Sequence, residues 1–307
     1  MPLHQTSGRW RLGLALSLVT TILWGFLPIT LAVTLQALDV YTVTWFRFLV
    51  AFAVLVVYLG ARQQLPEPQK LRSASLGLLA IATLFLGSNY LLFLQGLAQT
   101  SPTTAEIIIQ LASVFFGLGA LAVFKERYTL HQWVGLGVLT LGLILFFNEQ
   151  LKTVLTAQST YLVGNALLVI AAATWAIYAL AQKQLLDKLP SSTIMLIIYG
   201  GCAILFSPFA APQQLLSLSP LHFGMLLFCA LNTLIAYGSF AEALEHWEAS
   251  RVSAVIALTP IVTFVAVWLV SWLAPTLITP ERITTLGMLG AVLVVVGTVA
   301  IAIGKKR

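Results

Sequence analysis

The sequence predicts an all-α polytopic membrane protein with ten transmembrane helices, arranged as two inverted five-helix repeats. Three observations predict it: the composition, a regular succession of long apolar runs, and an internal repeat. Hydrophobic residues make up 59% of the 307 residues and charged residues only 8%, whereas a soluble domain carries about 25% charged residues. These side chains can therefore cover a surface that faces lipid, but not one that faces water.

The apolar runs have the length that a membrane span requires. A helix needs about 20 mostly apolar residues to cross a hydrocarbon core of about 30 Å. Ten runs meet or approach this length, namely residues 12–34, 41–60, 73–94, 103–123, 131–147, 161–184, 191–210, 220–243, 250–274 and 283–303. The first is too long for a typical cleaved leader, so we expect a retained helix. The connecting segments are short, so consecutive helices must run antiparallel.

Lysine and arginine residues divide unequally between the two sides of this predicted bundle. Thirteen of the 16 fall on one side, Lys152 and Arg282 fall on the other, and Arg47 lies inside a span. The positive-inside rule places the basic side in the cytoplasm. We therefore expect a multi-pass protein of the plasma (inner) membrane with both termini cytoplasmic. The net charge of +6 then needs no nucleic-acid partner to explain it.

An internal repeat divides the chain into halves, residues 1–150 and 151–307. The stretch "FKERYTLHQWVGLGVLTLGLIL" (124–145) aligns with "TPERITTLGMLGAVLVVVGTVA" (279–300). At this offset of 155 residues, Glu126 matches Glu281, Arg127 matches Arg282, Gly135 matches Gly290 and Gly142 matches Gly297. Each half holds five helices, an odd number, so the second half is expected to be inverted relative to the first. Inverted repeats are the architecture of alternating-access transporters.

The same segments carry a resemblance to a known family. The Trp24–Gly25 pair, the arginine of the second span, the "KER…QWVGLGVLTLG" corner and the "ALTPIVTF" of 257–264 resemble the EamA-type family of the drug/metabolite transporter (DMT) superfamily. The resemblance covers nearly the whole chain. It implies a fold of five plus five helices that moves small metabolites, often amino acids and frequently outward. One position departs: Pro260 matches the family's ninth-helix proline, but Ser113 occupies the matching place in the fourth helix, so the first half need not share a backbone break.

The fourth span carries one polar stripe. Its members are spaced 3, 4, 3 and 4 residues apart and are Thr103, Glu106, Gln110, Ser113 and Gly117. This spacing places them on one helix face, which in a membrane must meet protein or a water-filled cavity. A polar seam between helices would satisfy the stripe, but we predict a cavity because ionisable residues inside spans usually serve function. The coupling or gating candidates are Glu106, as a site of proton coupling, Ser113 and Pro260.

A single cation interrupts the second span, "YTVTWFRFLVAF" (41–52). Arg47 lies six residues from the start of this run, or about 9 Å deep at 1.5 Å per residue. A guanidinium in hydrocarbon costs roughly 3–15 kcal/mol, so Arg47 must snorkel to the surface, pair with Glu106, or bind a substrate carboxylate. Glu106 enters from the same side at a similar depth. We favour the pair or the substrate carboxylate over snorkelling.

Polar and aromatic residues at mid-span complete the predicted substrate site. Beside Arg47, Glu106 and Gln110 they are Trp24, Asn89, Tyr90, Trp175, Tyr178, Asn232 and Tyr237. The two tryptophans occupy matching places in the first helix of each half, where packing is the alternative role. Cys202 and Cys229 lie in apolar runs without metal-ligand spacing, so we expect packing residues, no metal and no cofactor.

These features predict a secondary transporter that exports a small polar metabolite, such as an amino acid, across the bilayer. No GxxxxGK[ST] motif is present, so ATP hydrolysis by this chain is not expected to drive it. A flippase-like carrier of an amphipathic or lipid-linked molecule is the alternative that the fold allows. A membrane-embedded enzyme is disfavoured, because the sequence shows no HExxH motif and no Ser–Lys pair.

Overall fold

The computed structural model describes residues 6–66, 75–100, 102–125, 128–146, 148, 159–273 and 284–303. Helices account for the regular structure in these segments, which contain no strand. Up to residue 148 the helices are α1 (Trp10–Thr34), α2 (Val40–Ala61), α4 (Leu76–Gln99), α5 (Pro102–Val123) and α6 (Leu130–Phe146). The later ones are α8 (Ser159–Leu185), α9 (Ser191–Phe206), α10 (Pro220–His246), α11 (Ala249–Ile256), α12 (Thr259–Leu273) and α13 (Thr285–Ile303), with short 3₁₀ helices η1 (Ser207–Phe209) and η2 (Pro212–Ser217) after α9.

The helices have the composition of membrane spans. In the described part of the chain, eight are long and apolar enough to cross a membrane, with α11 and α12 counted together as Ala249–Leu273. Two further helices, α6 and α13, are apolar but shorter. The protein is therefore a multi-pass, all-helical membrane protein, and the ten-span prediction is compatible with this set.

Two predicted spans differ from the helices observed. The run 191–210 leaves the α-helix at Phe206, because Pro208 has no N–H to donate and the chain continues as a 3₁₀ turn. The run 250–274 is divided into α11 and α12. Pro260 cannot donate to the Ile256 carbonyl, which instead accepts the Thr259 hydroxyl at 2.6 Å. By contrast, α5 runs unbroken through Ser113, as the difference between Ser113 and Pro260 predicts.

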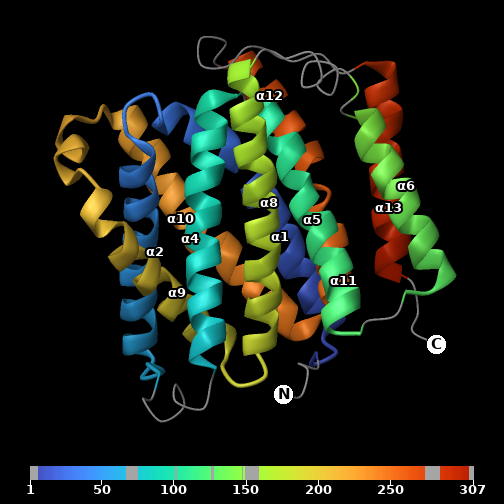
Figure 1. Cartoon of the computed structure of the whole chain (residues 1–307), viewed down its shortest axis with the longest axis horizontal. Coiled ribbons are helices and arrows are strands. Elements are labelled where there is room, and N and C mark those ends of the chain that lie inside the picture. Colours follow the sequence, from blue (N-terminus) through green and yellow to red (C-terminus); the bar gives the residue numbers. More distant parts are fainter. Residues whose placement is uncertain are drawn as a thin grey trace.

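Close helix pairs hold the bundle together. The helix α6 packs along α13, α4 along α8, and α1 along α10 (Figure 1). Glycine permits the closest of these contacts: a Cβ on Gly142 of α6 would lie 2.6 Å from the Val294 nitrogen of α13. These pairings are compatible with inverted halves, which stay a prediction. The corner residues that carried the repeat, Glu126, Arg127, Glu281 and Arg282, lie outside the described residues.

One end of the bundle is called here the terminal end, because α1 begins and α13 ends there (Figure 1). At this end α5 finishes at Val123 and α11 begins at Ala249. The starts of α5 and α8 lie at the opposite end, as does the exposed 3₁₀ segment η2. The mid-span residues of the predicted site therefore lie between two well-separated ends.

Candidate functional site

A cavity with about 630 Å³ of empty volume, its opening included, lies among α1, α2, α4, α5, α8, α10 and the α11–α12 break. Nine of the predicted site residues line it, namely Trp24, Arg47, Asn89, Tyr90, Glu106, Gln110, Ser113, Trp175 and Tyr237. The α5 stripe contributes three of them, so its polar face meets this cavity. This cavity, called here the first cavity, extends from mid-span toward the opposite end.

Arg47 turns into the bundle and away from the surface. Its side chain is 2% exposed. The Nε donates to the Thr233 hydroxyl at 3.0 Å and to the Cys229 carbonyl at 3.3 Å. The guanidinium carbon lies 4.3 Å from the centroid of the Tyr90 ring, a contact that stabilises by about 0.5–2 kcal/mol. These contacts replace water around the cation, so Arg47 does not snorkel in this structure.

Glu106 is the acidic residue of the same cavity. It is 4% exposed, and its Oε1 accepts the amide of Gln110, one helical turn away, at 2.6 Å. Among the described residues no ion pair joins it to Arg47. The two opposite charges therefore line one cavity without neutralising each other directly, an arrangement that costs free energy unless a ligand or water compensates it.

Two further polar atoms of the cavity wall lack a partner. The Trp24 Nε1 and the Gln110 Oε1 are buried and have no hydrogen-bond partner among the described residues. Buried polar groups in proteins are nearly always hydrogen-bonded, to protein, water or ligand. One donor and one acceptor without a described partner thus belong to residues that line the same cavity as the two charges.

Aromatic rings form a continuous wall around the middle of the cavity. The Trp24 ring meets Trp175 with centroids 5.6 Å apart and Tyr237 at 4.9 Å, both edge to face. Tyr237 in turn lies 5.4 Å from Tyr90, centroid to centroid. Such contacts are worth about 0.5–1.5 kcal/mol each beyond area burial. The tryptophans therefore both pack and line the cavity, so the two roles that the sequence left open are combined.

Three predicted site residues, Tyr178, Asn232 and Pro260, are not among the described residues that line this cavity. Tyr178 is fully buried and donates to the Met195 sulfur at 3.6 Å. Asn232 donates to the Leu23 carbonyl at 2.5 Å, and Pro260 sits in the first turn of α12 beside the lining residue Thr259. The side chain of Thr103 lies outside the described part. Asn89 does line the cavity, but its amide already donates to the Ala171 carbonyl at 2.9 Å.

Several residues of the site were not foreseen from the sequence. Thr233 binds both Arg47 and the Tyr90 hydroxyl, whereas the prediction names only its neighbour Asn232. Pro28 lies inside α1 and lines the cavity. Because proline has no N–H, it leaves the Trp24 carbonyl without its intrahelical donor. A proline in the middle of an apolar span was the available signal.

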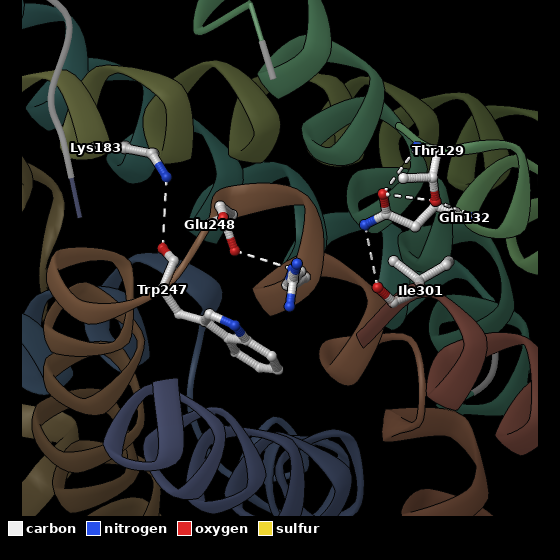
Figure 2. Close-up of polar contacts among 7 residues, drawn as sticks. Thr129, Gln132, Lys183, Trp247, Glu248 and Ile301 are labelled. Carbon is white, nitrogen blue, oxygen red and sulfur yellow. Dashed lines mark hydrogen bonds and ion pairs between the residues drawn. The ribbon is translucent and has the colours of Figure 1, made fainter. Parts of the chain in front are cut away.

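Polar contacts join neighbouring segments at the terminal end of the bundle. Lys183 of α8 donates to the Trp247 carbonyl between α10 and α11 at 3.5 Å, and Gln132 of α6 donates to the Ile301 carbonyl of α13 at 3.2 Å (Figure 2). His246 contacts the hydroxyl of Ser7 at 2.7 Å and a Glu242 oxygen at 3.3 Å. These contacts tie neighbouring helices and the N-terminal segment to one another.

One known family and several named relatives match most of this chain. The EamA-like transporter family matches residues 11–148 and 162–303. A Haemophilus influenzae protein named "Uncharacterized transporter" is 38% identical over 295 residues, which cover 96% of each chain. The Escherichia coli "Uncharacterized inner membrane transporter YhbE" is 38% identical over 96% of this chain and 92% of its own.

Two more distant likenesses are to a named efflux pump and to a solved structure. An Escherichia coli "Probable amino-acid metabolite efflux pump" is 24% identical over 92% of each chain. One solved crystal structure shares the fold with a TM-score of 0.72 at 14% identity, and the match covers 94% of this chain and 96% of that chain.

Proposed function

This chain belongs to the EamA-like transporter family, and on that premise we propose that it is a secondary transporter that exports a small zwitterionic metabolite, such as an amino acid. The observation that carries the proposal is the pair of opposite charges in the first cavity. Arg47 and Glu106 both line it, and no ion pair joins them among the described residues. A zwitterion satisfies both at once, with its carboxylate on the guanidinium and its ammonium on the carboxylate.

The rest of the cavity suits such a substrate. The unpaired Trp24 Nε1 and Gln110 Oε1 can donate to the substrate carboxylate and accept from its ammonium. Apolar residues, among them Leu27, Phe93 and Ile109, line the same cavity. A mostly apolar wall with a few placed polar groups is typical of small-molecule sites. The outward direction is supported by the more distant relatives in Escherichia coli and Salmonella typhimurium that are named "Probable amino-acid metabolite efflux pump".

Alternating access between two inverted halves, residues 1–150 and 151–307, is the proposed mechanism. The family match falls in two segments, one in each half. The helices α6 and α13, whose sequences align in the internal repeat, pack against each other across the halves. The protein would sit in the inner membrane with both termini cytoplasmic, which the distribution of lysine and arginine supports. The first cavity then extends from mid-span toward the outer side.

Glu106 is the proposed coupling residue. Its described partner is the neutral amide of Gln110, so a proton or a substrate ammonium can occupy the carboxylate in turn. If the substrate ammonium must leave this carboxylate before a proton binds to it, each exported zwitterion is exchanged for one inward proton. The neutral isostere Glu106→Gln removes the site for the proton and the site for the ammonium together, so it tests both roles of this carboxylate.

The test is transport by purified protein in proteoliposomes. Radiolabelled amino acids, simple carboxylates and simple amines are compared with and without a pH gradient, for wild type, Arg47→Gln and Glu106→Gln. Tyr178→Phe is the matched control, since it removes a buried polar contact of a residue that is not among those lining the cavity. We expect amino acids to be moved and Arg47→Gln to abolish transport. Glu106→Gln should lower the rate of transport, and the transport that remains should no longer respond to the pH gradient.

Other results would redirect the proposal. Transport of carboxylates without an ammonium would remove Glu106 from substrate recognition. A flippase-like carrier would be favoured if the protein moves a fluorescent lipid-linked probe and does not transport amino acids. Full transport by Arg47→Gln would contradict the assigned role of Arg47.

A further inference from the structure

A second cavity continues the line of the first toward the terminal end. It has about 320 Å³ of empty volume and lies among α5, α6, α11 and α13. Ser113, Gly117, Ser250 and Ser253 line it together with apolar residues, and Tyr128 lies near its far end. Among the residues described as lining the two cavities, only Ser113 is shared. The polar stripe of α5 thus passes from the first cavity, at Glu106, into the second, at Gly117.

A close contact between α5 and α11 includes Ser113, the residue that the two cavities share. The Ser253 hydroxyl of α11 donates to the Ser113 carbonyl of α5. One turn further along α5, a Cβ on Gly117 would lie 3.2 Å from that hydroxyl oxygen and 3.8 Å from the Ser253 Cβ. These three residues, Ser113, Gly117 and Ser253, are called here the serine seam. Because Gly117 has no side chain, Ser253 can approach α5 closely.

The helix that carries Ser253 is short and ends next to the seam. The α-helical hydrogen bonding stops after Ile256, and Leu258 donates to Val255 in a tighter turn at 3.0 Å. Pro260 cannot restore the missing bond. The described side-chain contacts near this end are neutral: Thr21 of α1 donates to the Val255 carbonyl at 3.3 Å, and Thr298 of α13 to the Ala254 carbonyl at 3.2 Å. Such bonds exchange easily for others, so α11 can tilt about Ala257 and Leu258.

We propose that the second cavity is the inner half of the translocation path and that the serine seam is the barrier that closes it. This inference rests on the proposed transport function. In the present structure the seam is closed and the first cavity holds the substrate site. A tilt of α11 breaks the Ser253–Ser113 bond, joins the two cavities, and offers the serine hydroxyls of the second cavity to the polar groups of the substrate. The contacts of Lys183 and Gln132 at the terminal end would loosen in the same step.

The seam has the geometry of a cross-link that can lock it. A Cβ–Cβ separation of 3.8 Å equals the mean found in disulfides. The double variant Gly117→Cys/Ser253→Cys, in a background with Cys202→Ala and Cys229→Ala, is reconstituted and assayed reduced, oxidised, and reduced again. We expect transport in the reduced states and at least a tenfold loss on oxidation. Each single cysteine variant is the control and should not respond to oxidant.

A second measurement does not depend on transport. Thr259→Cys places a thiol in the first cavity, and an impermeant maleimide is applied from the terminal end in vesicles of known orientation. Labelling from that end requires an open seam, so Ser253→Ala should raise its rate several-fold. Ser271→Ala is the matched control, because Ser271 donates within its own helix to Trp268.

The outcomes separate the two proposals. The barrier role of the serine seam would be wrong if the fully cross-linked pair transports at the undiminished rate. It would also be wrong if Ser253→Ala leaves the labelling rate of Thr259→Cys unchanged. Neither result would contradict the proposed transport function. If no substrate is moved by any variant, the proposed function fails, and the labelling experiment still decides whether the seam separates the two cavities.

Discussion

Arg47 and Tyr90 form a stacked pair whose two members bind the same hydroxyl. The guanidinium carbon lies 4.3 Å from the ring centroid, while the Arg47 Nε and the Tyr90 hydroxyl both donate to the Thr233 oxygen, at 3.0 and 3.3 Å. The three side chains come from α2, α4 and α10. A cation fixed from three helices keeps one orientation in the cavity, which is what selective recognition of a carboxylate requires.

Thr233→Val should loosen this cation without removing it. The Arg47 Nε would retain the Cys229 carbonyl at 3.3 Å and lose its shorter bond, which costs about 1–3 kcal/mol of stability for a buried group. We expect a lower unfolding temperature in detergent and a KM raised about tenfold. Thr263→Val is the control, since Thr263 bonds within its own helix. Equal effects of the two variants would contradict the assignment.

Tyr90 should act through its ring more than through its hydroxyl. Tyr90→Phe keeps the ring under the guanidinium and is expected to retain transport within about threefold. Tyr90→Leu removes a contact worth about 0.5–2 kcal/mol, so transport should fall by up to about thirtyfold. Initial rates in proteoliposomes decide this, and a larger loss with phenylalanine than with leucine would show that the hydroxyl dominates.

Trp24→Phe tests the unpaired indole donor. The substitution keeps an aromatic ring against Trp175 and Tyr237 but removes the Nε1 that has no described partner. If substrate accepts this hydrogen bond, a loss of about 1–2 kcal/mol raises the KM several-fold and leaves kcat nearly unchanged. An unaltered KM would assign the indole to packing alone.

Two glycines of α6 provide a matched test of helix packing. A Cβ on Gly142 would meet the α13 backbone at 2.6 Å, whereas one on Gly137 would meet nothing within 4 Å. Gly142→Ala should therefore force α6 from α13 and destabilise by about 1–3 kcal/mol. Gly137→Ala should be neutral or stabilising by up to about 1 kcal/mol, because alanine favours helix. Thermal unfolding of the purified variants measures both, and a reversed order would refute the packing described.

The proposed orientation can be tested by labelling cysteines in whole cells. Leu216 lies in η2, is 91% exposed, and belongs to the end opposite the termini, while Gln64 follows α2 at the terminal end. An impermeant maleimide should label Leu216→Cys in intact cells and Gln64→Cys only after permeabilisation. The parent protein is the control, because Cys202 and Cys229 are buried. The opposite pattern would invert the topology.

The broad architecture follows from local properties of the chain. Apolar runs of span length predict helices wherever the structure describes them, because the backbone of a membrane segment must satisfy its own hydrogen bonds. The spacing of Glu106, Gln110 and Ser113 predicts one polar helix face, and all three line the first cavity. The break before Pro260 and the unbroken α5 follow from the presence or absence of one backbone N–H.

The partners of these residues were decided only by the tertiary structure. Periodicity says which face of a helix is polar, but not which residue of another helix meets it. Arg47 thus binds Thr233, 186 positions later in the chain, and no ion pair to Glu106 is described. Ser253 reaches the Ser113 carbonyl because Gly117 leaves room for it, and Tyr178 and Asn232 bond elsewhere. Composition and spacing determined a membrane bundle with charges in its middle, while the packing of helices distant in sequence decided which side chains face the cavity, because that depends on helix rotation and distance of approach.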